Sequence, residues 1–63
     1  MKVEIQLKET SQPLVHIAFN TYEKGSLYCV FVRGENAEKV YKYPIENIFR
    51  VVEDYSYKKE GEE

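Results

Sequence analysis

One run of residues carries the strongest signal for the fold: Val40-Tyr41-Lys42-Tyr43-Pro44-Ile45-Glu46-Asn47-Ile48. β-Branched and aromatic side chains favour a strand over residues 39–43. Pro44 ends that strand, because proline cannot donate a hydrogen bond to a strand ladder. We therefore expect this run to form the last strands of a small β-barrel.

The segment after Pro44 fits two patterns. Apolar positions at helical spacing are Ile45, Ile48, Phe49 and Val52, whereas apolar positions at strand spacing are Phe49, Val51, Tyr55 and Tyr57. Because β-branched and aromatic residues dominate here, we favour a 3-10 turn over residues 44–47 and then a strand from about residue 48 to 55. The alternative is a helix over residues 45–52.

The first part of the chain alternates like a half-buried strand. In residues 2–8 every second side chain is apolar, which predicts a strand with one face on the core. Turn-forming residues interrupt the pattern over residues 9–13, and a second strand is expected over residues 14–21. Residues 22–26 then read as a hairpin loop in which Gly25 can adopt a positive φ.

The next segment, residues 27–33, is apolar on both faces. This is typical of a strand in the middle of a sheet, and it predicts that Leu27, Cys29 and Phe31 belong to the core. Residues 34–38 form the turn that leads into the strand of residues 39–43.

Five short strands with tight turns predict a mainly β protein, a small five-stranded antiparallel barrel of the SH3-like or Sm-like kind. A short 3-10 or helical turn is expected near residues 44–48. We expect a single small domain over residues 1–57. Residues 58–63 are mostly charged, which predicts a disordered acidic tail.

Composition narrows the function classes. The chain has 63 residues, one cysteine and a formal charge of −2. A domain of this size buries only about 60% of the surface of its unfolded chain, so oligomerisation would stabilise it. The absence of an apolar run as long as a membrane span predicts a cytoplasmic protein that does not interact with membranes. Acidic charge argues against coating long nucleic acids.

Residues 28–48 resemble the region that ends in the second Sm motif of the bacterial Sm-like family (Hfq). In both, an aromatic and aliphatic strand is followed by a polar turn, a Val-Tyr-Lys segment and a closing aliphatic strand. The resemblance implies an Sm-like barrel that forms a homo-oligomer and contacts RNA through Tyr41 and Lys42. Tyr43 stands where the family has histidine, and Tyr28 where it places a base-stacking aromatic. The Tyr-x-Tyr pattern is also similar to other small barrels, including the short domain at the end of some lysyl-tRNA synthetases.

These considerations select a set of candidate ligand-binding residues. Tyrosine rings provide stacking platforms for bases, and lysine can meet a phosphate. The candidates are Tyr28, Tyr41, Lys42 and Tyr43, with Arg33 and Lys39 assisting electrostatically. In a strand, Lys42 alternates to the opposite face from Tyr41 and Tyr43.

We expect no catalytic residues, metal site or cofactor. His16 has no second histidine and no carboxylate at ligand spacing, so it reads as a strand histidine satisfied by hydrogen bonds. Cys29 lies in an apolar strand and lacks an activating base. Glu53 and Asp54 point to opposite faces of a strand and read as solvated charges.

The sequence thus predicts a non-enzymatic, homo-oligomeric β-barrel that captures a nucleotide-type ligand, either a short RNA or a small nucleotide. The alternative is an acidic protein–protein interaction module, such as a phage-like inhibitor or sequestering protein. That alternative would depend on Glu53, Asp54 and the acidic tail, because electrostatic complementarity would guide docking on a basic partner.

Overall fold

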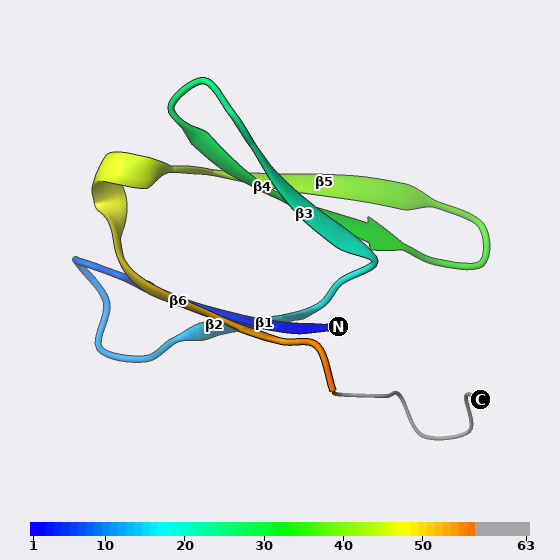
Figure 1. The fold of residues 1–63 in the computed structure, drawn as a ribbon, viewed down its shortest axis with the longest axis horizontal. Helices are drawn as coiled ribbons and strands as arrows, with labels where there is room; N and C mark the ends of the chain where they lie inside the picture. Colours follow the sequence, from blue (N-terminus) through cyan, green and yellow to red (C-terminus); the bar gives the residue numbers. More distant parts are fainter. Residues whose placement is uncertain (57–63) are drawn as a thin grey trace.

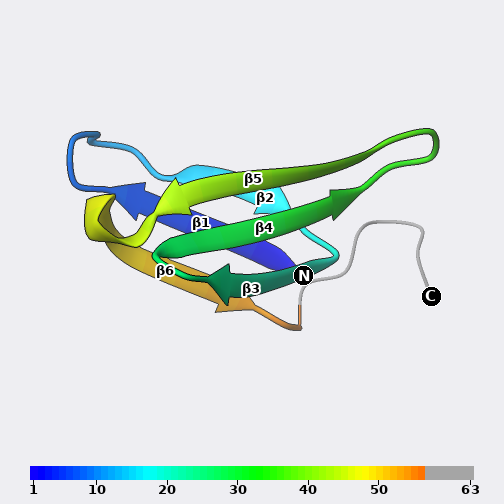
Figure 2. The same ribbon diagram turned by 90° about the horizontal axis from the view of Figure 1, so that it is seen from above.

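A computed structural model describes residues 1–56 as two three-stranded antiparallel sheets joined by short connections (Figure 1). The strands are β1 (Lys2–Leu7), β2 (Leu14–Ile17), β3 (Asn20–Lys24), β4 (Leu27–Arg33), β5 (Glu38–Pro44) and β6 (Ile48–Asp54), with the 3-10 turn η1 (Ile45–Asn47) before β6. The strand orders are β2-β1-β6 and β3-β4-β5. Seen from above, β2 and β5 lie along one side of the two layers, and β3 and β6 along the other (Figure 2).

The prediction of a mainly β fold is confirmed, but the prediction of one closed five-stranded barrel is wrong. The described residues form six strands in two separate sheets. The difference arises in the predicted strand of residues 14–21, which divides between the sheets. Ala18 N–H bonds to the carbonyl of Met1 at 2.7 Å, whereas Phe19 N–H bonds to the carbonyl of Phe31 at 2.8 Å. The backbone therefore changes sheets between these two residues.

This crossing also moves the predicted hairpin loop. Residues 22–24, expected in a loop, belong to β3, and the turn contracts to the two residues between Lys24 and Leu27. Gly25 adopts a φ of 61°, as the turn requires. The predicted 3-10 turn followed by a strand is confirmed by η1 and β6, and the alternative helix over residues 45–52 is not formed.

The core lies between the two sheets. Its buried side chains are Val3, Ile5, Ala18, Tyr28 and Val30. Cys29 is buried as predicted, but on the outer face of β4, where its cross-strand neighbours are Tyr22 and Lys42. Leu27 and Phe31 share that outer face and are only half-buried, because the strand alternation turns Tyr28 and Val30 inward.

Within residues 1–56, no helix has the length and apolar character needed to cross a membrane. The predicted tail over residues 58–63 lies outside the described residues.

Candidate functional site

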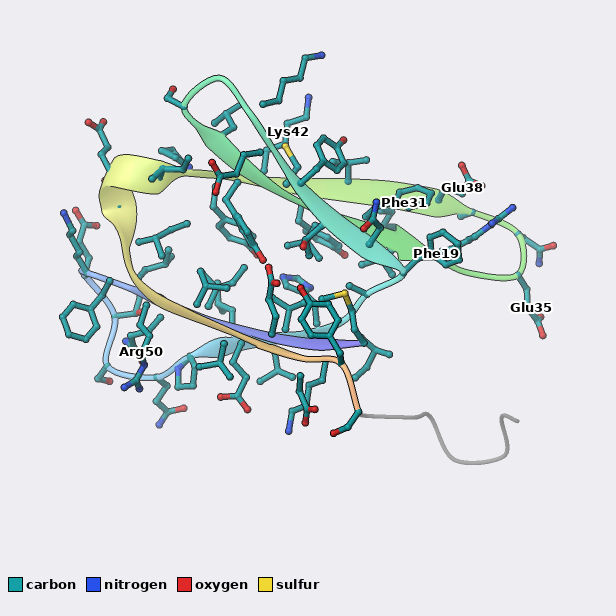
Figure 3. All side chains as sticks on the ribbon, viewed as in Figure 1. Phe19, Phe31, Glu35, Glu38, Lys42 and Arg50 are labelled. Atoms are coloured by element: carbon teal, nitrogen blue, oxygen red, sulfur yellow. The ribbon has the colours of Figure 1, made fainter. Side chains whose placement is uncertain are left out.

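The six predicted binding residues do not converge on one site. Lys39, Tyr41 and Tyr43 alternate onto the face of β5 that looks toward the other sheet, and Lys42 lies on the outer face (Figure 3). Lys42 therefore stands apart from both tyrosines, as its strand position predicts.

Arg33 is separate from these residues, whereas Tyr28 lies on the inner face of β4 directly opposite Tyr43. Arg33 ends β4 on the outer face, where its Nε lies 3.5 Å from the Glu38 carboxylate and its guanidinium lies 5.2 Å from the Phe19 ring centre. Tyr28 is buried between the sheets, so its ring cannot serve as an open stacking platform.

Tyr28 instead belongs to a hydrogen-bonded cluster around Glu53. The Tyr28 hydroxyl and the Thr21 hydroxyl both donate to Oε2 of Glu53, the latter at 3.0 Å. The Tyr55 hydroxyl donates to Oε1 of the same carboxylate. Since Glu53 comes from β6 and Thr21 and Tyr28 come from the other sheet, this cluster joins the two sheets along one side. We call these four residues the Glu53 cluster.

The cluster sets the protonation states of its members. Hydrogen bonds donated by Tyr28 and Tyr55 hold the pKa of Glu53 below its ordinary value. Burial, reinforced by the hydrogen bond to Glu53, raises the pKa of Tyr28 to about 12. At neutral pH the site therefore contains an ionised carboxylate and protonated phenols.

An open cleft of about 440 Å³ lies beside the Glu53 cluster. It is lined by Glu23, Tyr28, Ile45, Ile48, Val51, Glu53 and Tyr55. The volume falls in the range of about 300–1,000 Å³ that is usual for ligand sites. Two carboxylates, two phenols and three aliphatic side chains line it, and none of the described residues lining the cleft is Lys or Arg. The cleft is therefore suited to hydrogen-bond donors and positive charge.

A second polar group joins the sheets on the opposite side, between β2 and β5. His16 Nε2 and Tyr43 Oη are hydrogen-bonded at 2.7 Å, with the direction set by the histidine tautomer. The His16 ring centre also lies 4.5 Å from that of Tyr41. Burial lowers the pKa of His16. His16 is thus satisfied by a hydrogen bond, as predicted.

Sequence reasoning missed the role of Glu53, which is half-buried between the sheets and is not a solvated surface charge. One signal was present: Glu53 follows Val51 at strand period, so a core valine and the carboxylate must share a face. Tyr55 carries no comparable signal, because its ring is 73% exposed and its role depends on where Glu53 lies. Within residues 1–56, no three His, Cys, Asp or Glu side chains gather as a metal site would require.

Comparison with known proteins gives no match: no family model, no curated protein and no solved structure matches this chain. The Sm-like resemblance of residues 28–48 therefore stays a prediction.

Proposed function

We propose that this chain is a non-enzymatic protein-binding module whose cleft beside β3 and β6 receives a Lys or Arg side chain of a partner. The observation that carries the proposal is the lining of the cleft, which combines the carboxylates of Glu23 and Glu53 and the phenols of Tyr28 and Tyr55 with aliphatic side chains. This develops the acidic-interaction alternative predicted from the sequence.

Each part of the cleft has a counterpart in a long cationic side chain. The ammonium or guanidinium head would form charge-assisted hydrogen bonds with Glu53 and Glu23. The exposed ring of Tyr55 offers a cation–π contact, and the methylene stem would pack on Ile45 and Ile48. A carboxylate accepts about four hydrogen bonds. Three hydroxyl groups already donate to the Glu53 carboxylate, so about one acceptor position remains for the cationic head of the partner.

The same electrostatics favour binding over catalysis. A general acid or base works best with a pKa near the working pH, whereas the phenol hydrogen bonds move the pKa of Glu53 further below it. The net charge of −2 would in addition accelerate encounter with a basic partner.

The proposal is tested by titrating the protein with N-acetyl-arginine methylamide and following backbone and tyrosine resonances by NMR. We expect saturable shifts at Glu23, Tyr28 and Tyr55, with a dissociation constant on the order of 1 mM, as a single side chain provides. The uncharged norleucine analogue should leave these resonances in place.

Glu23→Gln should weaken this binding several-fold, because it removes one carboxylate from the cleft. Glu35→Gln is the matched control, since it removes the same charge from the turn between β4 and β5, which does not line the cleft. Equal effects of the two variants, or shifts that avoid the cleft, would refute the proposed site.

A second candidate is capture of a nucleotide-type ligand on the β2/β5 side, the function expected from the sequence. It is favoured by one arrangement: Lys39, Tyr41 and Tyr43 share the inner face of β5, with His16 against both rings. Base stacking on Tyr41 would contribute about 1–3 kcal/mol, and the Lys39 ammonium would form an ion pair with a phosphate. The predicted contacts of Tyr28, Lys42 and Arg33 are not part of this arrangement.

Adenosine monophosphate and a short single-stranded RNA test the second candidate. If it holds, Tyr41→Ala and Lys39→Ala should each weaken binding while Glu23→Gln does not. Binding that responds only to Glu23→Gln would assign the ligand to the acidic cleft and exclude the tyrosine face.

A further inference from the structure

β5 forms one edge of the sheet that contains β3, β4 and β5. β5 is the last strand in the order β3-β4-β5, so within residues 1–56 no strand pairs with it on that side. Every residue of this strand except Tyr43 is exposed. An edge strand of this length presents a row of backbone donors and acceptors to another chain.

The alternation of hydrogen-bonded pairs between β4 and β5 shows which backbone N–H and C=O groups of β5 point away from β4, toward the free edge. At the two ends of this ladder, Gly34 N–H donates to the carbonyl of Ala37 at 2.8 Å, and Ile45 N–H donates to the carbonyl of Ser26 at 2.9 Å. Bonded and non-bonded pairs alternate in an antiparallel ladder. In the register of β4 and β5, the bonded residues of β5 are therefore Lys39, Tyr41 and Tyr43.

The remaining residues of β5 direct their backbone N–H and C=O groups outward. These are Glu38, Val40, Lys42 and Pro44, of which Pro44 has no N–H to donate. Their side chains all lie on the outer face of the sheet. From Glu38 to Lys42, this face presents an acid, an aliphatic residue and a base.

We propose that β5 pairs with β5 of a second copy of this chain, antiparallel and centred on Val40, to form a two-fold symmetric dimer with a continuous six-stranded sheet (two copies of the three-stranded sheet). Val40 lies opposite Val40 of the second copy, and Glu38 lies opposite Lys42 of the second copy. Each of these pairs exchanges two backbone hydrogen bonds. By symmetry, the Glu38–Lys42 ion pair forms twice.

Charge and backbone chemistry select this register over its neighbours. Centring the pairing on Lys42 or on Glu38 would place like charges opposite each other, which is destabilising. A shift that opposes Val40 and Lys42 would place Glu38 against Pro44, which lacks the required N–H. The shift in the other direction, which opposes Val40 and Glu38, would place Lys39 opposite Lys39 of the second copy. Register slips by one residue are excluded, because they would turn every side chain to the wrong face.

Side chains on the inner face of β5 would also form a favourable contact in this pairing. Lys39 of one copy would lie in a close, non-hydrogen-bonded pair with Tyr41 of the second copy, about 4.5 Å between Cα atoms. An ammonium group beside a phenol ring is a favourable cation–π arrangement. The dimer would thus have Glu38–Lys42 ion pairs on the outer face and Lys39–Tyr41 contacts on the inner face.

A charge-exchange experiment tests the dimer by sedimentation equilibrium. The wild-type protein should dimerise, and Lys42→Glu and Glu38→Lys should each weaken the dimer roughly tenfold or more, because each opposes like charges twice. Mixing the two variants should restore a heterodimer, since every ion pair is then complementary. Lys24→Glu, the same charge change on β3, is the matched control and should leave the dimer unchanged.

The proposal is overturned if the wild-type protein remains a monomer, if Lys42→Glu and Lys24→Glu behave alike, or if the mixture gains no dimer. A covalent test complements this one. Val40→Cys should form a disulfide-linked dimer on mild oxidation, because paired Cα atoms about 5.5 Å apart suit a disulfide. Wild-type protein, whose Cys29 is buried, should not; a folded Val40→Cys protein that fails to cross-link would reject the register.

Discussion

The phenol of Tyr28 on β4 donates a hydrogen bond to the carboxylate of Glu53 on β6, and this contact joins the two sheets. β3 and β6 lie along one side of the two layers, and β2 and β5 along the other (Figure 2). Glu53 on β6 also accepts from Thr21 on β3, while His16 on β2 and Tyr43 on β5 join the sheets on the other side. Within residues 1–56 the core between the sheets is small, with five buried side chains. Polar contacts at both sides therefore determine how the sheets stack and where the acidic cleft opens.

Removing the Tyr28 hydroxyl should destabilise the fold. Hydrogen bonds to charged groups contribute about 1.5–3 kcal/mol, and Tyr28 is only 7% exposed. We expect Tyr28→Phe to lower the free energy of unfolding by about 2 kcal/mol, measured by urea denaturation. Tyr22→Phe, on the outer face, should change it by less than about 0.5 kcal/mol. Equal losses in the two variants would contradict the role assigned to the contact.

Tyr28 should also make the fold sensitive to alkali. Its pKa is raised from 10.0 to about 12 in the folded protein, so the folded state holds the phenolic proton more tightly than the unfolded state. The resulting stabilisation is complete below pH 10 and is lost as the pH rises toward 12. Urea denaturation between pH 9 and about 12 should show this decline, and Tyr28→Phe should flatten it. A decline of the same slope in Tyr28→Phe would assign it to other groups.

Glu53 should have the opposite effect in acid. Hydrogen bonds from Tyr28 and Tyr55 lower its pKa from the ordinary value of 4.5. Its contribution to stability is therefore present above pH 4.5 and is lost as the pH falls through the folded-state pKa. Glu53→Gln should be less stable than wild type at pH 7, and the difference should shrink below pH 4. A constant difference from pH 3 to 7, by chemical denaturation, would argue against an ionised Glu53.

His16 provides a third pH dependence. Burial lowers its pKa from 6.5, so His16 binds a proton more weakly in the folded chain than in the unfolded chain. Stability should fall as the pH drops below 6.5, and His16→Gln should remove this part of the profile. The measurement is the midpoint of thermal unfolding at pH values between 5 and 8. An unchanged slope in His16→Gln would show that another group is responsible.

Gly25 tests the turn between β3 and β4. Its φ of 61° lies in the left-handed region, and a Cβ there would meet nothing within 4 Å. Substitution should therefore cost only backbone strain, about 1 kcal/mol for Gly25→Ala and less for Gly25→Asn, which tolerates this conformation better. Denaturation midpoints of both variants check the order. A larger loss for Asn would contradict this account of the turn.

Much of the local structure follows from residue order. The period-two pattern of residues 2–8, the apolar strand at 27–33 and the termination at Pro44 correspond to β1, β4 and the end of β5. The 3-10 turn and β6 were also predictable, because proline geometry and strand propensity act over a few residues. Strand alternation alone is enough to place Lys42 on the opposite face from Tyr41 and Tyr43.

The arrangement of the sheets does not follow from such patterns. The chain changes sheets at Ala18 because that residue bonds to Met1 while Phe19 bonds to Phe31, and both partners are distant in sequence. The acidic cleft likewise depends on Thr21 and Tyr28 meeting Glu53 across the core. Residue order set which side chains alternate along each strand, and long-range backbone pairing set which of those faces meet.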